Sequence, residues 1–209
     1  PELMSFLFAE ANSGNQVYWV VPRINAGDTT PDEAGGDEKE AVAAIESAVK
    51  RLKAVGDTRL RAGENDWKVE AVHGKVPGPE RDRILTAFRQ GEVHVLVATT
   101  VIEVGVDVPG ANIMVVEGAD RFGMAQLHQL RGRTGRGSAQ AWCFLLEPPA
   151  APWDAGEGMN PTRSGGWPEE TAARLRAFAS TEDGFAIAEM DLKRRGAGAL
   201  DGSRQSGFG

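Results

Sequence analysis

The sequence predicts an α/β fold, in which a parallel sheet flanked by helices is followed by a helical hairpin and a glycine-rich loop. Short apolar runs rich in β-branched residues recur along the chain, and they are mostly continuous rather than alternating, as in strands buried on both faces. Segments with helical spacing of apolar residues lie between these runs. Strands that alternate with helices are typical of parallel sheets with right-handed crossovers.

Five apolar runs are expected to form the strands, and they cover residues 17–21, 67–73, 93–98, 113–117 and 140–146. Between the first two, one helical face is predicted from apolar residues spaced 3, 4 and 3 apart, at Val42, Ile45, Val49 and Leu52. Gly56 is expected to end this helix, because glycine is common just past a helix end.

A second helix is predicted from Pro79 to Arg89, with proline in its first turn and Gly91 after its end. A third covers residues 124–129. Two more are predicted after residue 168, separated by a turn at 180–184. Their apolar residues are Leu175, Phe178 and Ala179 in one and Phe185, Ala188 and Leu192 in the other.

Composition divides the chain into three parts. Residues 1–147 are expected to form the α/β lobe, 148–168 a linker or insertion, and 169–209 the hairpin and a glycine-rich tail. The acidic segment 26–38 and the proline- and glycine-rich segment 147–170 are both predicted to be surface loops.

The net charge of −7 argues at first against nucleic acid, but residues 28–40 alone contribute six acids against one lysine. Basic patches elsewhere therefore remain compatible with the composition. No apolar run approaches the roughly 18 residues of a membrane span, and no signal peptide is recognisable. The one cysteine, Cys143, excludes an internal disulfide and is expected to be a buried small hydrophobe. We therefore expect an intracellular protein.

The segment "RGRTGR" at 131–136 combines three arginines with two glycines. Guanidinium groups match phosphate oxygens, and neighbouring glycines let the backbone approach a ligand. Such a pattern suits binding of a transferring phosphate. An RNA-binding arginine/glycine segment or a solvated basic loop explains it equally well when it is taken alone.

Small hydroxyl residues, Thr99 and Thr100, follow the third predicted strand. Ligands bind at the carboxyl ends of strands in open α/β sheets, and hydroxyl groups there can hold phosphate. Asp107 lies among apolar neighbours and needs a partner, either a ligand such as a nucleotide ribose or its own loop.

Four motifs in order resemble the second RecA-like lobe of superfamily 2 helicases. "VYWVVPRI" resembles motif IV, "VATTVIEVGVDVP" motif V and "QLHQLRGRTGRG" motif VI, while "VHGKVPGPERDRILTAFRQGEVHVLVAT" resembles the stretch before motif V. The tail "DGFAIAEMDLKRRGAGALDGSRQSG" is similar to the translocation motif shared by the RecG and Mfd families. "DRFG" and "GSRQSG" are closer to RecG, with Mfd as the nearest relative.

This resemblance implies roles for individual residues. Arg133 and Arg136 would be arginine fingers directed at the γ-phosphate of ATP, with Gln129 sensing the same cleft. Gly105 and Asp107 would lie near the ribose, Thr99 and Thr100 on the DNA backbone, Arg204 and Gln205 on duplex DNA, and Arg195 would hold the hairpin for coupling. His73 and His128 are interpreted as structural, Arg131 has no assigned role, and no metal site is expected. Without the resemblance, a frayed terminus would be the preferred reading of the tail.

The resemblance also implies a function, that of an ATP-dependent double-stranded DNA translocase or helicase acting on branched DNA in repair and recombination. No "GxxxxGK[ST]" phosphate loop and no helicase-type acidic Mg²⁺ motif occur in the sequence. ATP and Mg²⁺ would be bound mainly by an N-terminal RecA-like lobe, and a wedge domain would complete the parent protein. The chain is therefore expected to be an inactive fragment, with DNA and these domains as partners, no membrane partner, and a place in the bacterial cytoplasm at the nucleoid. The alternatives are the equivalent lobe of Mfd and a non-catalytic nucleic-acid-binding module.

Overall fold

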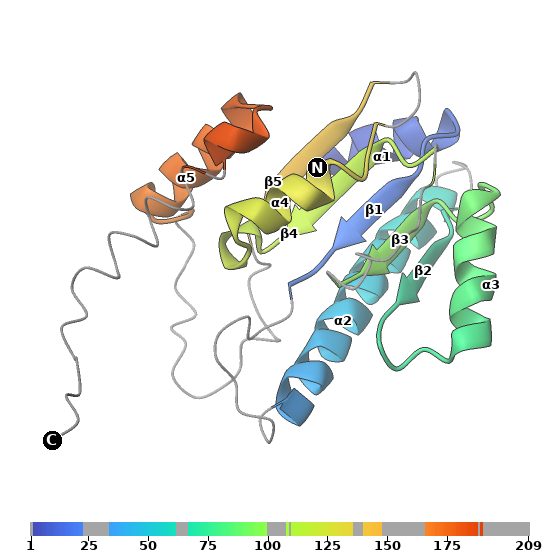
Figure 1. Ribbon diagram of the computed structural model, residues 1–209. Helices are drawn as coiled ribbons and strands as arrows, with labels where there is room; N and C mark the ends of the chain where they lie inside the picture. Colours follow the sequence, from blue (N-terminus) through green and yellow to red (C-terminus); the bar gives the residue numbers. More distant parts are fainter. Residues whose placement is uncertain are drawn as a thin grey trace, which may run out of the picture.

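A five-stranded, wholly parallel sheet forms the centre of the molecule (Figure 1). A computed structural model describes residues 2–22, 34–61, 67–99, 108, 110–135, 140–147, 166–187 and 189. In the long helix at 34–61, side chains are described only for residues 39–59. The strands follow the order β2-β3-β1-β4-β5. Their bounds are Val17–Val20 for β1, Val69–Val72 for β2, Val95–Ala98 for β3, Ile113–Glu117 for β4 and Trp142–Leu146 for β5.

Burial of the strands follows their place in the sheet. The three inner strands β1, β3 and β4 are buried at every residue, whereas the edge strands β2 and β5 are only partly buried. In register, Val17 of β1 lies beside Val95 of β3 on one side and Ile113 of β4 on the other. The continuous apolar runs thus correctly predicted the five strands, whereas the expected burial on both faces holds only for the three inner ones.

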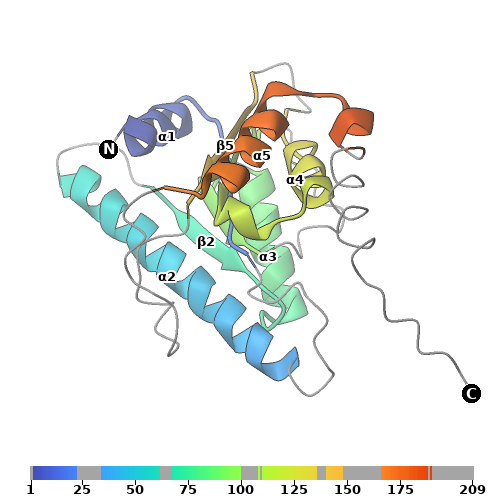
Figure 2. The same cartoon turned by 90° about the vertical axis from the view of Figure 1, so that its left-hand side faces the viewer.

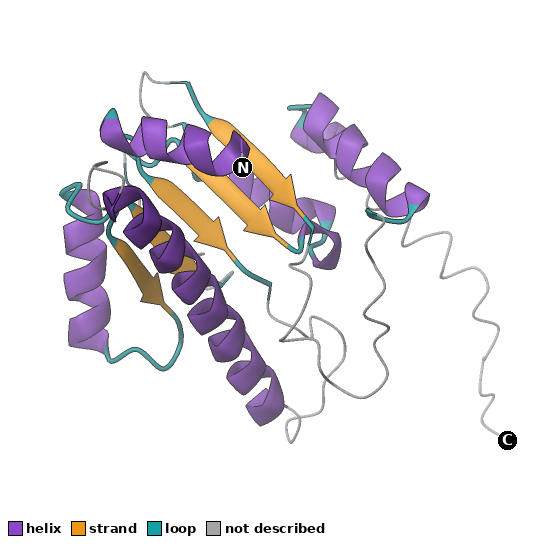
Figure 3. Cartoon of the chain, turned by 180° about the vertical axis from the view of Figure 1, so that it is seen from behind, coloured by secondary structure: helices purple, strands orange, loops and turns teal. Residues whose placement is uncertain are grey.

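Helices cover both faces of the sheet. Helices α1 (Glu2–Asn12) and α2 (Ala34–Arg61) lie on one face, which is turned toward the viewer in Figure 3. Helices α3 (Gly78–Arg89), α4 (Met124–Arg131) and α5 (Glu169–Ser180) contribute apolar side chains to the core on the other face. A short 3₁₀ helix, η2 (Ala119–Arg121), lies between β4 and α4. Alternate residues of each inner strand supply the two cores.

The prediction that Gly56 ends the helix after β1 is wrong. Helix α2 continues to Arg61, and Gly56 is buried within it. A Cβ atom on Gly56 would lie 3.4 Å from the Cβ atom of Trp67, so α2 packs directly beside this residue. The prediction of a loop over 26–38 is also wrong for its last residues, because α2 begins at Ala34; residues 23–33 lie outside the described part.

Helix α1 was not predicted, although its buried residues Leu7, Phe8 and Ala11 have helical spacing. The predicted bounds of α3 and α4 are confirmed to within two residues, and α5 contains the three apolar residues Leu175, Phe178 and Ala179 predicted for the first hairpin helix. Residues 184–187 are helical, which agrees with a second hairpin helix; the segment 148–165 and the tail from 190 lie outside the described residues. No helix among the described residues is long and apolar enough to cross a membrane.

Candidate functional site

The carboxyl ends of the parallel strands meet at one edge of the sheet, where ligands bind in open α/β folds. Thr99 directly follows β3 at this edge. It is only 3% exposed, so a contact between its hydroxyl and DNA would require neighbouring residues to uncover it. Thr100, Gly105 and Asp107 lie outside the described residues, and their predicted roles stay predictions.

Helix α4 carries the residues that resemble motif VI. Its buried side chains Met124, Leu127 and Leu130 face the core, which leaves Gln129 exposed on the other side. The helix ends at Arg131, and Gly132 and Arg133 continue the turn by donating their backbone N–H groups to His128 and Leu130. Both described candidates, Gln129 and Arg133, therefore belong to one short helix and the turn that ends it.

The turn after α4 is tightly built. The Thr134 hydroxyl donates to the carbonyl oxygen of Arg131 at 3.0 Å, and Gly135 has a φ of 77°. A Cβ atom on Gly135 would lie 2.6 Å from the Cβ atom of Ala141. Gly135 is thus required by the left-handed backbone and by close packing, in addition to any approach to a ligand. Arg133 is partly exposed in this turn and also interacts within the chain, whereas Arg136 is outside the described residues.

Arg131, to which the sequence assigned no role, joins α4 to α5. Its Nη1 atom donates to the carbonyl oxygens of Phe178 at 3.2 Å and of Thr181 at 2.7 Å. Its guanidinium carbon lies 4.5 Å from the centroid of the Phe178 ring, and its Nη2 atom is 3.4 Å from Nδ1 of His128. No local sequence signal could have indicated this, because both accepting carbonyls lie about 50 residues further along the chain.

Arg174 makes the reciprocal contact from α5. It donates to the carbonyl oxygens of Phe122 and Asp120, both at 2.9 Å, in the segment that leads into α4. We call Arg131 and Arg174 together the arginine clamp. Figure 2 shows α4 and α5 side by side. Arg131 of α4 binds carbonyl oxygens at the end of α5, and Arg174 of α5 binds carbonyl oxygens in the segment before α4. The two helices are therefore joined by contacts from both sides.

The turn that follows α5 also lies on α4. A Cβ atom on Gly184 would be 3.0 Å from Nε2 of His128, so the hairpin turn passes directly over this ring. His128 is half-buried there, which agrees with its interpretation as a structural residue. Its ring lies between Arg131 and the hairpin turn, so the helix that resembles motif VI and the start of the tail are in direct contact.

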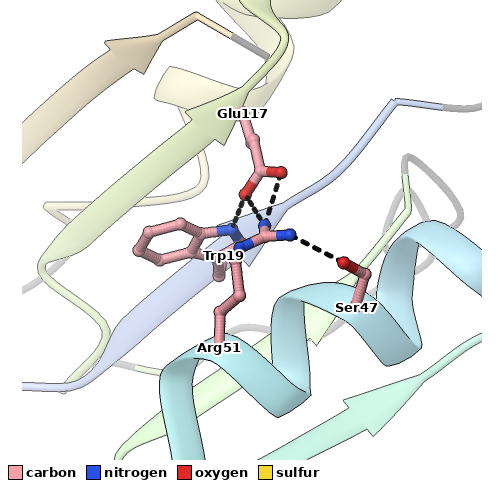
Figure 4. Close-up of polar contacts among 4 residues, drawn as sticks. All are labelled: Trp19, Ser47, Arg51 and Glu117. Atoms are coloured by element: carbon pink, nitrogen blue, oxygen red, sulfur yellow. Dashed lines mark hydrogen bonds and ion pairs between the residues drawn. The ribbon is translucent and has the colours of Figure 1, made fainter. Parts of the chain in front are cut away.

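A second polar cluster lies at the carboxyl end of β4 (Figure 4). The carboxylate of Glu117 accepts hydrogen bonds from Nε1 of Trp19 at 2.8 Å and from Nη2 of Arg51 at 2.7 and 2.8 Å. Nη1 of Arg51 donates to the hydroxyl of Ser47 at 2.8 Å. This cluster connects β1, β4 and α2, and sequence reasoning did not find it, because its partners are as much as 98 residues apart.

The predicted nucleotide site has two described residues on α4 and the turn after it. Arg133 supplies a cation and Gln129 an amide, and both suit a phosphate-lined cleft. Among the described residues, no group of three or more histidine, cysteine, aspartate or glutamate side chains is placed to hold a metal ion. Arg195, Arg204 and Gln205 lie outside the described residues, and their roles also stay predictions.

Comparison with protein families and known proteins agrees with these features. The family model of the helicase conserved C-terminal domain matches residues 35–138. The ATP-dependent DNA helicase RecG of Mycobacterium tuberculosis (strain H37Rv) is 44% identical over 203 residues, which cover 96% of this chain and 24% of that protein. RecG of Thermotoga maritima is 39% identical over 207 residues, which cover 99% of the chain and 22% of that protein. The chain thus spans about a quarter of the length of these relatives.

A solved structure of RecG bound to a three-way DNA junction matches over 95% of this chain and 21% of that one, with 36% identity and a TM-score of 0.62. This match covers far more of the chain than residues 35–138 of the helicase domain model. The observed parallel sheet with helices on both faces is the RecA-like fold that the motifs predicted. The chain belongs to the helicase C-terminal domain family, and it is the RecA-like lobe that corresponds to the C-terminal helicase lobe of RecG.

Proposed function

We propose that this chain is the C-terminal motor lobe of an ATP-dependent double-stranded DNA translocase or helicase that acts on branched DNA. Similarity over nearly the whole chain to RecG, including a structure of RecG on a DNA junction, supports the proposal. The observation that carries it is the match over 95% of this chain to a structure of RecG bound to a three-way DNA junction. Within "RGRTGR", Arg131 is engaged by α5, and Arg133 lies in the turn after α4, where it also interacts within the chain.

In this proposal, Arg133 and Arg136 donate to the transferring phosphate of a nucleotide held by another lobe of the parent protein. ATP, when bound, supplies the phosphoanhydride bond, and charge develops on the transferring phosphate as that bond breaks. Gln129, exposed on the same helix, would contact the same cleft, and Gly105 and Asp107 would approach the ribose. The described residues fit the cationic part of such a site, and Mg²⁺ and the phosphate loop would belong to the N-terminal RecA-like lobe.

The arginine clamp supports a route from the nucleotide to DNA. A shift of α4 as the cleft closes would be passed by Arg131 and Arg174 to α5 and from there to the tail. Arg195 would couple the hairpin to the tail, Arg204 and Gln205 would contact duplex DNA, and Thr99 and Thr100 would approach the DNA backbone. We retain the division into a lobe at 1–147, a linker at 148–168 and a hairpin with tail at 169–209 as part of this proposal.

The partners follow from the same proposal. The chain would act beside an N-terminal RecA-like lobe and a wedge domain of its parent protein, on DNA at the bacterial nucleoid, in repair and recombination. The equivalent lobe of Mfd is the second candidate within this class, and the RecG-like wording of "DRFG" and "GSRQSG" favours RecG. A non-catalytic nucleic-acid-binding module is the candidate from a different class.

The decisive experiment measures DNA-stimulated ATP hydrolysis by the full-length parent protein. Arg133→Ala and Arg136→Ala are each expected to slow hydrolysis by roughly 10³-fold while changing nucleotide affinity little, because arginine fingers act mainly on the transition state. Arg176→Ala is the matched control, since this exposed arginine pairs only with Glu169 on α5 among the described contacts. Full hydrolysis in both finger variants would refute the arginine assignment, and a parent without any ATPase activity would favour the non-catalytic module.

The 209-residue chain alone gives a second test. It is expected to show negligible ATP hydrolysis and weak DNA binding that falls steeply with salt, because phosphate contacts dominate such binding. Titration of labelled branched and linear duplexes at several salt concentrations measures this. Binding that does not change with salt would contradict the proposal.

A further inference from the structure

The carboxylate of Glu117 is almost entirely buried, with 6% of its side chain exposed, at the last residue of β4. Removing a carboxylate from water costs several kcal/mol, and a well-packed apolar side chain often stabilises a core equally well. Packing alone therefore does not require a carboxylate here. Its hydrogen bonds instead fix the position of the Glu117 carboxylate, because Trp19 and Arg51 together donate to both of its oxygens.

The donors to Glu117 come from one face of the sheet. Trp19 belongs to the core under α1 and α2, and Arg51 and Ser47 are on α2 itself (Figure 4). The backbone after Glu117 crosses to the opposite face, through η2 and into α4. Glu117 thus contacts Arg51 of α2 and is also the residue at which the segment leading to Gln129 and Arg133 begins.

This segment has little freedom between its two ends. Gly118 has a φ of 63°, and a Cβ atom there would lie 3.1 Å from Cγ of Pro22. Beyond it, Arg174 of α5 holds the carbonyl oxygens of Asp120 and Phe122. The connection from β4 to α4 is therefore held from α2 on one face and from α5 on the other.

We infer that Glu117 is a positioning residue, through which Arg51 of α2 sets the start of the segment that carries Gln129 and Arg133. The effect on ATP turnover rests on the proposed function, whereas the positioning itself does not. A displacement of α2 against the sheet moves Arg51, and because its Nη2 atom contacts both Glu117 oxygens, the end of β4 moves with it. Helix α2 and the arginine turn thereby act as one unit across the sheet.

The test compares Arg51→Met with Arg59→Met in the full-length parent protein. Both variants replace an arginine of α2 with an unbranched apolar side chain, but Arg59 contacts α1, at Ser5 and at the Phe8 ring, and not Glu117. Hydrogen exchange of the amides in 118–131 is the first readout. Arg51→Met is expected to raise their exchange rates about tenfold at the assay temperature, and Arg59→Met to leave them unchanged.

Steady-state ATP hydrolysis is the second readout. Arg51→Met and Glu117→Gln are each expected to lower kcat about tenfold with little change in the KM for ATP, and the double variant to do little more, because both remove one interaction. Arg51→Lys keeps a single cationic nitrogen that can reach both oxygens and is expected to recover most of the exchange protection. This variant also tests the inference should Arg51→Met fold poorly.

Equal exchange in the Arg51→Met and Arg59→Met proteins, or no recovery by Arg51→Lys, would overturn the inference. So would a lowered Tm in Arg51→Met with exchange and kcat unchanged at the assay temperature, since Arg51 would then only stabilise the fold. The two proposals fail separately. If Arg133→Ala leaves hydrolysis intact while Arg51→Met still raises exchange in 118–131, the proposed function is wrong and the positioning role of Glu117 stands.

Discussion

Arg131 and Phe178 contact each other in two ways, through a 3.2 Å hydrogen bond from the guanidinium to the Phe178 carbonyl oxygen and through a 4.5 Å approach of the guanidinium to the ring. The same Nη1 atom reaches the carbonyl oxygen of Thr181 at 2.7 Å. These contacts hold the end of α5, where the Phe178 carbonyl oxygen also accepts a 3.5 Å hydrogen bond from the Thr181 backbone N–H. One arginine of "RGRTGR" is therefore an internal connection between α4 and the hairpin.

Replacing Arg131 with alanine is expected to lower the free energy of unfolding of the chain by about 2–3 kcal/mol, because two charge-assisted hydrogen bonds and a cation–π contact are lost. Urea denaturation followed by circular dichroism measures the change. Arg176→Ala, which removes an exposed ion pair on the same helix α5, should leave stability nearly unchanged. Similar losses in the two variants would show that the clamp contributes no more than a surface pair.

Gln16 ties α3 and the segment after it to the start of β1. Its buried amide donates to the carbonyl oxygens of Phe88 and Val93, the latter at 2.8 Å. Gln16→Met keeps the side-chain length but removes both donors, and it is expected to cost about 2 kcal/mol of stability, because a buried carbonyl loses its partner. Gln90→Met, at an exposed position after α3, is the control for the chemical change itself. No difference between the two variants in thermal or urea unfolding would contradict this account.

Gly118 turns the chain from β4 into η2 with a left-handed backbone. Gly118→Ala is expected to destabilise the chain by about 1–2 kcal/mol, because an L-residue is disfavoured at this φ and the new Cβ atom would press on Pro22. The measurement is the shift in the urea midpoint at constant slope. Gly78→Ala provides the comparison, since nothing lies within 4 Å of its Cβ position. An equal or larger loss at Gly78 would argue against strain at Gly118.

Cys143 is expected to make the free energy of unfolding depend on pH in the alkaline range. Burial raises the pKa of its thiol to about 11 from an ordinary value of 9.0, and the nearby Arg131 cation opposes this shift only in part. The folded state therefore keeps the proton that the unfolded chain loses, so the contribution of Cys143 is fully present below about pH 9 and is lost as pH rises towards 11.

Unfolding free energies at pH 8 and pH 10.5 are the measurement for this thiol. The wild-type chain is expected to lose up to about 2 kcal/mol more than Cys143→Ala over this interval, because other titrating groups contribute equally to both proteins. Native Cys143 should also react slowly with iodoacetamide at pH 8, since the thiolate is the reactive form. Parallel pH dependence in the two proteins would contradict the raised pKa.

The sequence alone determined the elements whose signals are local. Strands buried on both faces must be apolar throughout, so β1, β3 and β4 could be recognised from composition. Helix α3 could be bounded by Pro79 and Gly91, because proline fixes its own φ and glycine readily adopts the left-handed φ of 78° found after the helix. Motif order predicted the RecA-like lobe, and comparison with known proteins confirmed it. The roles of Arg136, Asp107, Arg195, Arg204 and Gln205 stay predictions.

Local signals failed where distant residues decide the outcome. Gly56 looks like a helix end, yet α2 continues to Arg61 and buries Gly56 beside Trp67. The three arginines at 131, 133 and 136 are chemically alike, and only the position of α5 gives the first one its carbonyl partners at Phe178 and Thr181. Glu117 shows no pattern at all, because Trp19 and Arg51 lie 98 and 66 residues away. A long, permanently charged side chain donates to whichever acceptors the folded chain brings within its reach. The tertiary structure therefore determines the partners of these arginines.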